Sequence, residues 1–434
     1  MKIGIVAAST ALLITATTQP AAARDNGLVV QVAPPTGGDD TAILQAALDR
    51  CVGHQDSCKV HLSPGRYRTR QLVAYDFRGT FEGAGQDRTV IEPVGTLRVC
   101  PTLCSKNPDT TTNLWPDLMI FVDGNVRLSD ISIQIKKVPA TTDYFLGNAL
   151  ISAVRMMTSE FGTMTATVER VSIEGAHDES SFFRGFGLLN GIIAAGELLK
   201  PGADPNGDYD IKRDTFPLKG SFRFSSNTFK TCFSAIDMNR LFDGRLVVGG
   251  DDGAGNSASD TRRAFELANF ENSTVEISHN RASSHWDLIV DNFYYPAERA
   301  SRYSIHHNIF SGETEFGDGI ILWDNDLPPK TIDATVVHNT VADGPFYFAM
   351  IETLNTEGTL IAANRVRGSA LAGIMIENGT RNAILGNDVS GVTADIGRIL
   401  LDSTTTRSLV AGACRPGDVV DQGQANIVLC KARD

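Results

Sequence analysis

The spacing of apolar residues changes from a helical period to a period of two shortly before residue 60. Residues 40–49 carry apolar side chains on one face, and Asp39 or Asp40 is placed to cap the first turn of a helix there. From residue 60 onward, short runs alternate apolar and polar positions between glycines and prolines, as in 60–62, 79–85 and 89–91. The pattern predicts one early amphipathic helix followed by a long series of short β-strands.

A repeat of strand, asparagine and strand emerges in the second half of the chain. Asparagines follow short apolar strands at intervals of 28, 31, 25 and 23 residues. They are Asn280, Asn308, Asn339, Asn364 and Asn387. Asn227 precedes this series by 53 residues, which fits two repeats with one degenerate member. A second strand recurs between the asparagines, at 234–237, 287–290, 319–322, 349–351, 373–376 and 398–401.

This periodicity indicates an all-β solenoid of parallel strands. One coil cannot bury its own apolar face, whereas coils stacked about 4.8 Å apart share a continuous core. Asparagine suits the corner of each coil because it tolerates left-handed backbone and its amide can bond the amide of the next coil. We expect one domain over residues 24–434, with the helix at 40–49 capping its N-terminal end and the asparagines in one column.

Composition and charge narrow the class of protein. The 434 residues are 42% hydrophobic and 21% charged, which argues against a disordered chain. The net charge of −12 provides no surplus of Lys and Arg for phosphates, so nucleic acid is not an expected partner. Beyond the N-terminus no apolar run reaches about 18 residues, so neither a polytopic membrane protein nor a membrane partner is expected.

The N-terminus has the features of a secretory signal peptide. Lys2 precedes an apolar stretch at 3–16, and small residues at 21–23 form a cleavage site. We expect residues 1–23 to be removed and the mature protein to be secreted or periplasmic, where disulfides persist.

Seven cysteines can then pair in an oxidising compartment. Cys51 and Cys58 flank a short polar loop and are the first expected disulfide, and Cys414 and Cys430 could staple the C-terminal end. Cys232 lies in an apolar segment and is expected to be a buried free thiol. A further pairing, of Cys100 with Cys104, is left open.

Three motifs near the N-terminus carry a resemblance to a known superfamily. They read Asp-Asp-Thr-Ala-Ile-Leu-Gln-Ala-Ala-Leu over 39–48, Val-x-Leu-x-Pro-Gly-x-Tyr over 60–67 and Gly-Thr-Phe-Glu-Gly-Ala-Gly over 79–85. With the asparagine repeat, they resemble the pectin-lyase-like right-handed parallel β-helix proteins over nearly the whole mature chain. The resemblance implies the fold and a right-handed coil. It does not identify the activity, because the fold hosts lyases, glycoside hydrolases, epimerases, esterases and noncatalytic surface proteins.

No catalytic set of a member family can be transferred to this sequence. The Gly-His-Gly and Arg-Ile-Lys of polygalacturonases are absent, and so is the Asp-Pro-His-Asp of mannuronan epimerases. The site must therefore be argued from the residues that flank the second recurring strand.

Polar residues flank that strand, and we expect a substrate groove along the sheet it forms. Equivalent positions of adjacent coils should lie about 5 Å apart. The groove should run beside 235–238, 287–290 and 319–322, walled by an inserted loop at about 178–218 and by 291–302. Candidate proton-transfer or charge-neutralising groups are Arg281, His285, Tyr294 and Asp318; candidate sugar-binding groups are Trp286, Tyr295, Arg240 and Asn292; candidate cation ligands or acids are Asp237, Asp291 and Asp324.

Two further features suggest metal ions. A loop with alternating oxygen donors, which suits Ca²⁺, contains Asp204, Asn206, Asp208 and Asp210. Histidines that directly precede or adjoin the repeated asparagines are His279, His306, His307 and His338. Register alone explains the histidines, so we expect them at a turn away from the groove.

These features favour a secreted polysaccharide-active enzyme, with polysaccharide as partner and Ca²⁺ as candidate cofactor. The first expectation is a lyase, because β-elimination on a uronate needs a cationic group at the carboxylate and a base at C5. A glycoside hydrolase is the alternative, with Asp291 and either Asp318 or Asp324 as its two carboxylates. A noncatalytic carbohydrate-binding or cell-surface protein is the third. The sugar, the linkage and the oligomeric state are left open.

Overall fold

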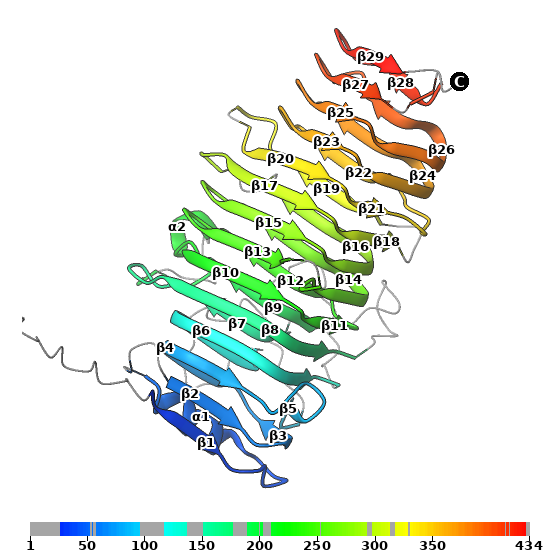
Figure 1. The fold of residues 1–434 in the computed structure, drawn as a ribbon. Coiled ribbons are helices and arrows are strands. Elements are labelled where there is room, and N and C mark those ends of the chain that lie inside the picture. The colour runs from blue at the N-terminus through cyan, green and yellow to red at the C-terminus, as the bar shows by residue number, and fades with distance from the viewer. Residues whose placement is uncertain are drawn as a thin grey trace, which may run out of the picture.

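The computed structural model describes residues 27–95, 117–136, 151–176, 189–202, 210–292, 297–312, 317–328, 330–412, 414–415 and 417–430, apart from residues 53, 55–57, 199 and 252. Within these ranges the chain forms two helices, α1 (Thr41–Asp49) and the short α2 (Ile211–Asp214), and strands that pair in parallel. Each strand pairs with its equivalent one coil later, so the strands stack from β1 at one end to β29 at the other (Figure 1).

The strand segments stack into three columns, named sheets A, B and C. Strands confined to sheet A are β1 (Val29–Val32), β2 (Cys58–Leu62), β10 (Gly220–Ser225), β13 (Arg245–Gly249), β15 (Thr274–Ser278), β17 (Ser301–His306), β20 (Ile332–Val337), β23 (Leu360–Ala362), β25 (Ala383–Leu385), β27 (Leu409–Gly412) and β29 (Ile427–Cys430). Those of sheet B are β3 (Gly65–Thr69), β5 (Thr89–Pro93), β11 (Thr228–Lys230), β18 (Ile309–Gly312) and β21 (Thr340–Val341). Those of sheet C are β7 (Ile151–Met157), β9 (Leu189–Ala195), β12 (Ser234–Asn239), β19 (Ile320–Trp323), β22 (Ala349–Leu354) and β28 (Val419–Asp421).

Longer strands bend from one sheet into the next. They are β4 (Leu72–Glu82), β6 (Met119–Gln134), β8 (Met164–Glu174), β14 (Ser257–Ala268), β16 (Arg281–Asp291), β24 (Arg365–Glu377) and β26 (Asp388–Leu401). The first parts of β14, β16, β24 and β26 lie in sheet B, and their second parts lie in sheet C.

The interior is built from the apolar half of each alternating strand. In sheet C one buried side chain from each coil lies in a continuous row, because the strands pair without a shift at this position. The row contains Ile236, Phe265, Leu288, Ile320, Ile351, Ile374 and Ile399. Since successive residues of a strand point to opposite faces, the residues one position further along point outward and form a second row.

The predicted asparagine column is confirmed at the turn from sheet A to sheet B. The Nδ2 of Asn280 donates to Oδ1 of Asn308 at 3.0 Å, and the same bond joins Asn308 to Asn339, Asn339 to Asn364 and Asn364 to Asn387. The left-handed corner belongs to a different residue than expected. The residue before each asparagine takes the positive φ, as His279 does at 59°, and the asparagine contributes its side-chain bonds.

The column has a member that the spacing analysis treated as degenerate. Asn256 accepts from Nδ2 of Asn227 at 3.0 Å and donates to Oδ1 of Asn280 at 2.9 Å, so the coil between them carries a complete corner. Residues 250–255 separate Asn256 from the preceding strand β13, which hides the repeat in the sequence. The interval of 53 residues is therefore two coils, as predicted, with no degenerate member.

The histidines lie at this corner, away from sheet C, as predicted. The ring of His307 stacks between those of His279 and His338, with centroids 5.1 and 5.3 Å apart. The Nδ1 atoms of His306 and His307 are 3.0 Å apart, so one of them donates to the other.

Helix α1 forms where the apolar spacing predicts it, and it lies near β1 and β2 at the N-terminal end of the stack (Figure 1). Leu44, Ala47 and Leu48 are its buried residues, and the helix contacts β1 and β4. Asp40 occupies the cap position, but its carboxylate accepts from the backbone N–H groups of Thr36 and Arg68 instead of from the helix. That the helix caps the whole stack stays a prediction.

The cysteine predictions are confirmed where the structure describes them. Cys51 is bonded to Cys58 and Cys414 to Cys430, and Cys232 is free and buried. Burial raises the pKa of the Cys232 thiol to about 12, so this sulfur stays protonated.

The inserted loop expected at about 178–218 is wrong in its extent. Strand β9 lies inside that range and pairs with both β7 and β12, so it is a regular member of sheet C. The asparagine repeat marks the turn from sheet A to sheet B, so it gave no signal for this strand of sheet C. The described segment between β9 and β10 includes α2, and its Leu198 and Phe216 pack over the outer face of sheet C.

Several predictions fall outside the described residues: the signal peptide at 1–23 and the residues Cys100, Cys104, Asp204, Asn206, Asp208, Tyr294 and Tyr295. In the part that the structure describes, no helix is long and apolar enough to cross a membrane.

Candidate active site

The outward row of sheet C is apolar at both ends and charged in the middle. Val73 and Ile120 lie in an apolar cluster at the N-terminal end, and Met375 and Leu400 lie in another at the C-terminal end. Between these two clusters each coil contributes one residue to the row, and some of these residues are charged and others apolar. In order these are Arg155, Ile193, Asp237, Glu266, Ile289, Ile321 and Glu352.

Asp237 and Glu266 are direct neighbours in this row. Asp237 in β12 pairs with Glu266 in β14, and both carboxyl groups are half-buried on the same face. Adjacent strands are about 4.8 Å apart, so the register brings the backbones of the two residues to about that separation and places both carboxyl groups on one face. Strands β12 and β14 lie in the middle of the stack, and the pair is therefore far from either end of the molecule (Figure 1).

Two arginines flank the pair. The Nη1 of Arg263 lies 2.5 Å from each carboxylate oxygen of Glu266. The buried Arg155, two coils earlier, donates to Asp117 at 2.6 Å and to Glu197 at 2.7 Å. Both guanidinium groups are thus already bonded to carboxylates, and they sit on either side of Asp237.

Asp237 holds a proton more tightly than an ordinary carboxylic acid. Burial raises the pKa of Asp237 well above 3.8, and the negative charges of Glu266 and Glu197 raise it further. Arg263 and Arg155 oppose this rise without cancelling it. Asp237 therefore suits the role of proton donor, beside a second carboxylate that binds a guanidinium.

Trp286 extends the site toward the next coils. Its ring lies opposite Arg263 across the strand pair, with the guanidinium carbon of Arg263 at 5.6 Å from the ring centroid and that of Arg262 at 5.2 Å. The ring N–H of Trp286 is a hydrogen-bond donor to Asp318. Trp286 therefore joins the charged pair to a second group of carboxylates.

His285 contacts Trp286, but it is too buried to match the predicted proton-transfer group at the surface of the groove. Only 3% of the residue is exposed, and its ring meets the edge of Trp286 with centroids 4.4 Å apart. Burial, together with the charges of Arg262 and Arg263, lowers the pKa of His285 to about 4, so the imidazole is neutral at pH 7.

Asp318 and Glu352 form the second carboxylate group, from adjacent coils. Asp318 accepts from the backbone N–H groups of Phe348 at 3.1 Å and Ala349 at 2.9 Å, and burial raises its pKa to about 6. Burial, aided by the charge of Asp318, raises the pKa of Glu352 to about 8. The ring N–H of Trp323 donates to Oε1 of Glu352 at 3.0 Å, whereas Oε2 is buried with no partner among the described residues.

Four predicted site residues lie away from the outer face of sheet C: Arg281, Arg240, Asn292 and Asp324. Arg281 begins β16 in sheet B, where it is exposed. Asp291, at the other end of β16, does lie on the outer face of sheet C. Arg240 is buried and donates to the carbonyl of Gly196 and the hydroxyl of Thr215. The others, Asn292 and Asp324, are also buried in corner hydrogen bonds: Asn292 with Phe270 and Thr331, and Asp324 with Thr331, Ile332 and Asn325.

These corrections have one physical reason. The residues that follow a strand of sheet C sit at the corner of the coil, where backbone N–H groups leave the ladder and need acceptors. Asp324 satisfies the backbone N–H groups of Thr331 and Ile332, so it serves the corner and not the groove. Asp237, Asp318, Trp286 and Asp291 are the predicted residues that do lie on the outer side of sheet C or beside it.

The predicted calcium sites gain no geometric support. Asp237, Asp291 and Asp324 do not converge, and the described residues contain no group of three or more His, Cys, Asp or Glu side chains placed to hold a metal ion. Asp210 is the described member of the loop set, and it caps α2 by accepting from the N–H of Arg213 at 2.9 Å. Calcium binding therefore stays a prediction.

Glu266, Arg263 and Arg155 are the residues that the sequence analysis missed. Glu266 and Arg263 belong to the coil whose corner is Asn256, which the sequence analysis counted as a degenerate member of the repeat without locating its strands. The available signal was the alternation around Phe265, which is buried in register with Ile236.

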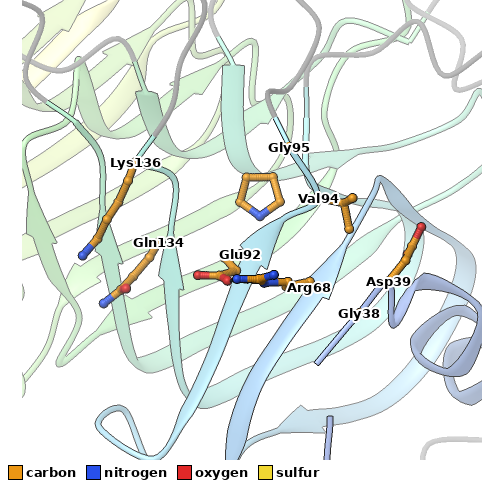
Figure 2. A pocket seen from close by; sticks show the side chains of 9 residues that line it. Gly38, Asp39, Arg68, Glu92, Val94, Gly95, Gln134 and Lys136 are labelled. Atoms are coloured by element: carbon orange, nitrogen blue, oxygen red, sulfur yellow. Dashed lines mark hydrogen bonds and ion pairs between the residues drawn. The ribbon is translucent and has the colours of Figure 1, made fainter. Parts of the chain in front are cut away.

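A cavity lies on a different face, near the N-terminal end. Figure 2 shows it lined by residues that include Asp39, Arg68, Glu92 and Lys136, with the ends of the Glu92 and Arg68 side chains next to each other. Arg66 and Arg68 bind Glu92, and although burial acts in the opposite direction, these bonds hold the pKa of Glu92 below 4.5.

Comparison with known proteins supports the fold. No protein-family profile matches the chain. The protein nessun dorma of Drosophila melanogaster is 26% identical over 95 residues, which is 22% of this chain and only 14% of that protein's length. This match is too short to show a family.

Solved structures match over nearly the whole chain. The DFA-IIIase of Arthrobacter chlorophenolicus A6, solved without its lid in complex with GF2, has a TM-score of 0.57 at 10% identity and covers 94% of this chain and 99% of that one. The A-module of a mannuronan C-5 epimerase of Azotobacter vinelandii has a TM-score of 0.41 at 13% identity, with 91% and 92% covered. The chain thus shares the overall fold of the DFA-IIIase, and its parallel β-strands stack coil upon coil as its motifs predict.

Proposed function

We propose that this protein is a glycoside hydrolase acting on a polysaccharide, with Asp237 as general acid and Glu266 as nucleophile. The observation that carries the proposal is the direct register of the two residues on the outer face of sheet C. Enzymes that hydrolyse with retention of configuration place their two carboxyl groups about 5–5.5 Å apart, close to the spacing of adjacent coils. The fold neighbour solved in complex with GF2 is consistent with a carbohydrate substrate.

The reaction follows from the raised pKa of Asp237 and from the position of Glu266 beside it. Asp237 donates its proton to the glycosidic oxygen as the bond from that oxygen to the anomeric carbon breaks, while a Glu266 oxygen bonds to the same carbon. The Asp237 carboxylate then removes a proton from water, whose oxygen attacks the anomeric carbon and releases Glu266. Water is consumed, both residues return to their starting forms, and the anomeric configuration is retained.

The arginines favour hydrolysis over the β-elimination expected first from the sequence. A lyase needs a cationic group available to the uronate carboxylate. Arg155 and Arg263 are instead bonded to Asp117, Glu197 and Glu266. The outer face therefore offers paired carboxyl groups to the substrate, and this arrangement suits a neutral sugar better than a polyanion.

The test is a panel of neutral glycans and polyuronates: inulin, barley β-glucan, xylan, alginate and polygalacturonate. Hydrolysis should release reducing ends without the absorbance of unsaturated uronates, and NMR of the first product should show the anomer of the substrate. Asp237→Asn and Glu266→Gln should each reduce kcat by about 10²–10⁴-fold. Asp333→Asn, the same change at an exposed site on sheet A, is the matched control.

Two results would contradict the proposal, and each has a different meaning. Unsaturated products from alginate or polygalacturonate would show a lyase. Full turnover by both variants on a hydrolysed glycan would place the catalytic residues elsewhere.

A further inference from the structure

Two exposed aromatic side chains adjoin the second carboxylate group. Tyr347 and Phe348 precede β22 at the turn from sheet B to sheet C, and 52% and 45% of their surfaces are exposed. Their rings meet edge to face, with centroids 4.5 Å apart. They line a cavity of about 470 Å³ whose other residues include Ser369, Thr393 and Asp395.

The chemistry of this cavity matches a sugar. Aromatic rings offer a flat apolar surface for the C–H face of a sugar ring, and Tyr adds a polar hydroxyl. Ser369, Thr393 and Asp395 supply hydrogen-bonding groups at the rim for sugar hydroxyls.

A series of contacts connects this cavity to the proposed catalytic pair. The N–H of Phe348 donates to Asp318, Asp318 also accepts from the ring of Trp286, and Trp286 lies opposite Arg263, which binds Glu266. In the outward row, Glu266 and Glu352 are three coils apart, or about 14 Å along the stack. One coil is close in length to one unit of an extended glycan, so a chain of a few sugars could cover this distance.

The charges indicate what kind of chain would lie there. Asp318 and Asp395 bring acidic side chains to this end of the face, and the protein carries a net charge of −12. Both disfavour a polyanion.

We propose that Tyr347 and Phe348 form a distal sugar-binding subsite for a neutral polysaccharide chain that lies along sheet C. The inference deepens the proposed function, because the same chain would have its scissile bond at Asp237 and Glu266. The subsite binds sugar units several positions from that bond. It therefore contributes to the binding of long chains and not to the chemical step.

The kinetic test compares long and short substrates with the double variant Tyr347→Ala/Phe348→Ala. On a long neutral glycan that the wild-type protein hydrolyses, KM should rise about tenfold with kcat unchanged, because the stacking surface is lost. On the disaccharide of the same glycan, both parameters should stay at the wild-type values. Phe161→Ala is the matched control, since Phe161 is 91% exposed between β7 and β8. An equal change on long and short substrates, or no change on either, would overturn the proposal.

A binding test separates this proposal from the proposed function. Wild-type protein, the double variant and Asp237→Asn are run on native gels containing inulin, barley β-glucan or alginate. Retardation by a neutral glycan that persists in Asp237→Asn and is lost in the double variant supports the subsite, even if no glycan is hydrolysed. Retardation by alginate alone, or retardation unchanged in the double variant, contradicts it, and so does the absence of retardation in every gel.

Discussion

Glu352→Gln should stabilise the protein increasingly as pH rises, because the folded state keeps the wild-type side chain protonated. The substitution removes the ionisable carboxyl group but leaves an oxygen for the Trp323 N–H, which lies 3.0 Å from Oε1 in the wild type. Glu352 is 5% exposed, and its pKa is raised from 4.5 to about 8 by burial and by Asp318. Between these two values the unfolded chain has lost a proton that the folded protein retains, so wild-type stability falls as pH rises.

The size of the effect follows from the pKa difference. Each pH unit between 4.5 and 8 favours the unfolded state by about 1.4 kcal/mol, which gives about 3 kcal/mol by pH 7 and about 5 kcal/mol above pH 8. Glutamine does not titrate, so the variant lacks this dependence at residue 352. Urea unfolding of both proteins between pH 5 and pH 9, followed by circular dichroism, measures the difference in the free energy of unfolding.

That difference should widen in favour of the variant up to about pH 8 and then level off. Glu276→Gln, on the exposed face of sheet A, controls for the substitution itself. A free-energy difference that stays constant across the pH range would show that Glu352 is charged in the folded protein, and the electrostatic argument for this part of the site would be wrong.

Three further outcomes are expected. In a pH profile of kcat/KM, activity should be lost as rising pH removes the Asp237 proton. Because the Glu197 charge raises the pKa of Asp237, Glu197→Gln should move this alkaline limb to lower pH. A limb that stays at the same pH would count against Asp237 as the acid. Asn308→Ala should lower the free energy of unfolding by about 2–4 kcal/mol in urea titrations, since buried partners of its amide lose their bonds; a loss below that range would mean that the column contributes little. Cys414→Ser should cost about 3 kcal/mol, because Cys414 and Cys430 close a loop of 16 residues; equal denaturation midpoints for the variant and the oxidised wild type would contradict this.

The site illustrates how a solenoid assembles chemistry from residues far apart in sequence. Asp237 and Glu266 are separated by a whole coil, and the hydrogen-bonded register of β12 and β14 brings them together. A shift of one residue in that pairing would turn one of the two carboxyl groups toward the core. The buried row through Ile236 and Phe265 opposes such a shift, because the same displacement would expose it.

The repeat of apolar strands and asparagines determined the fold class before any tertiary information was used. Each coil must bury the same apolar positions and form the same turn. The same sequence pattern therefore recurs every 23–31 residues and can be recognised from residues that are close in the sequence. The amphipathic spacing of 41–49 and the short loop between Cys51 and Cys58 are local in the same way, and both predictions are confirmed.

The tertiary structure decided which polar residues face one another. The sequence grouped Asp237, Asp291 and Asp324 as candidate cation ligands or acids of one groove, yet Asp324 bonds the backbone of a corner while Asp237 faces Glu266.

The physical reason lies in how each property is encoded. Burial of the apolar face of a strand depends on residues a few positions apart in the sequence. The partner of an outward carboxyl group instead depends on how many residues each coil has in its turns. Residues 250–255 alter that number just before Asn256, so the sequence pattern did not show where Arg263 and Glu266 lie in their coil. The sequence therefore determined the stack and its inner face, and only the folded register determined the pairings on the outer face of sheet C.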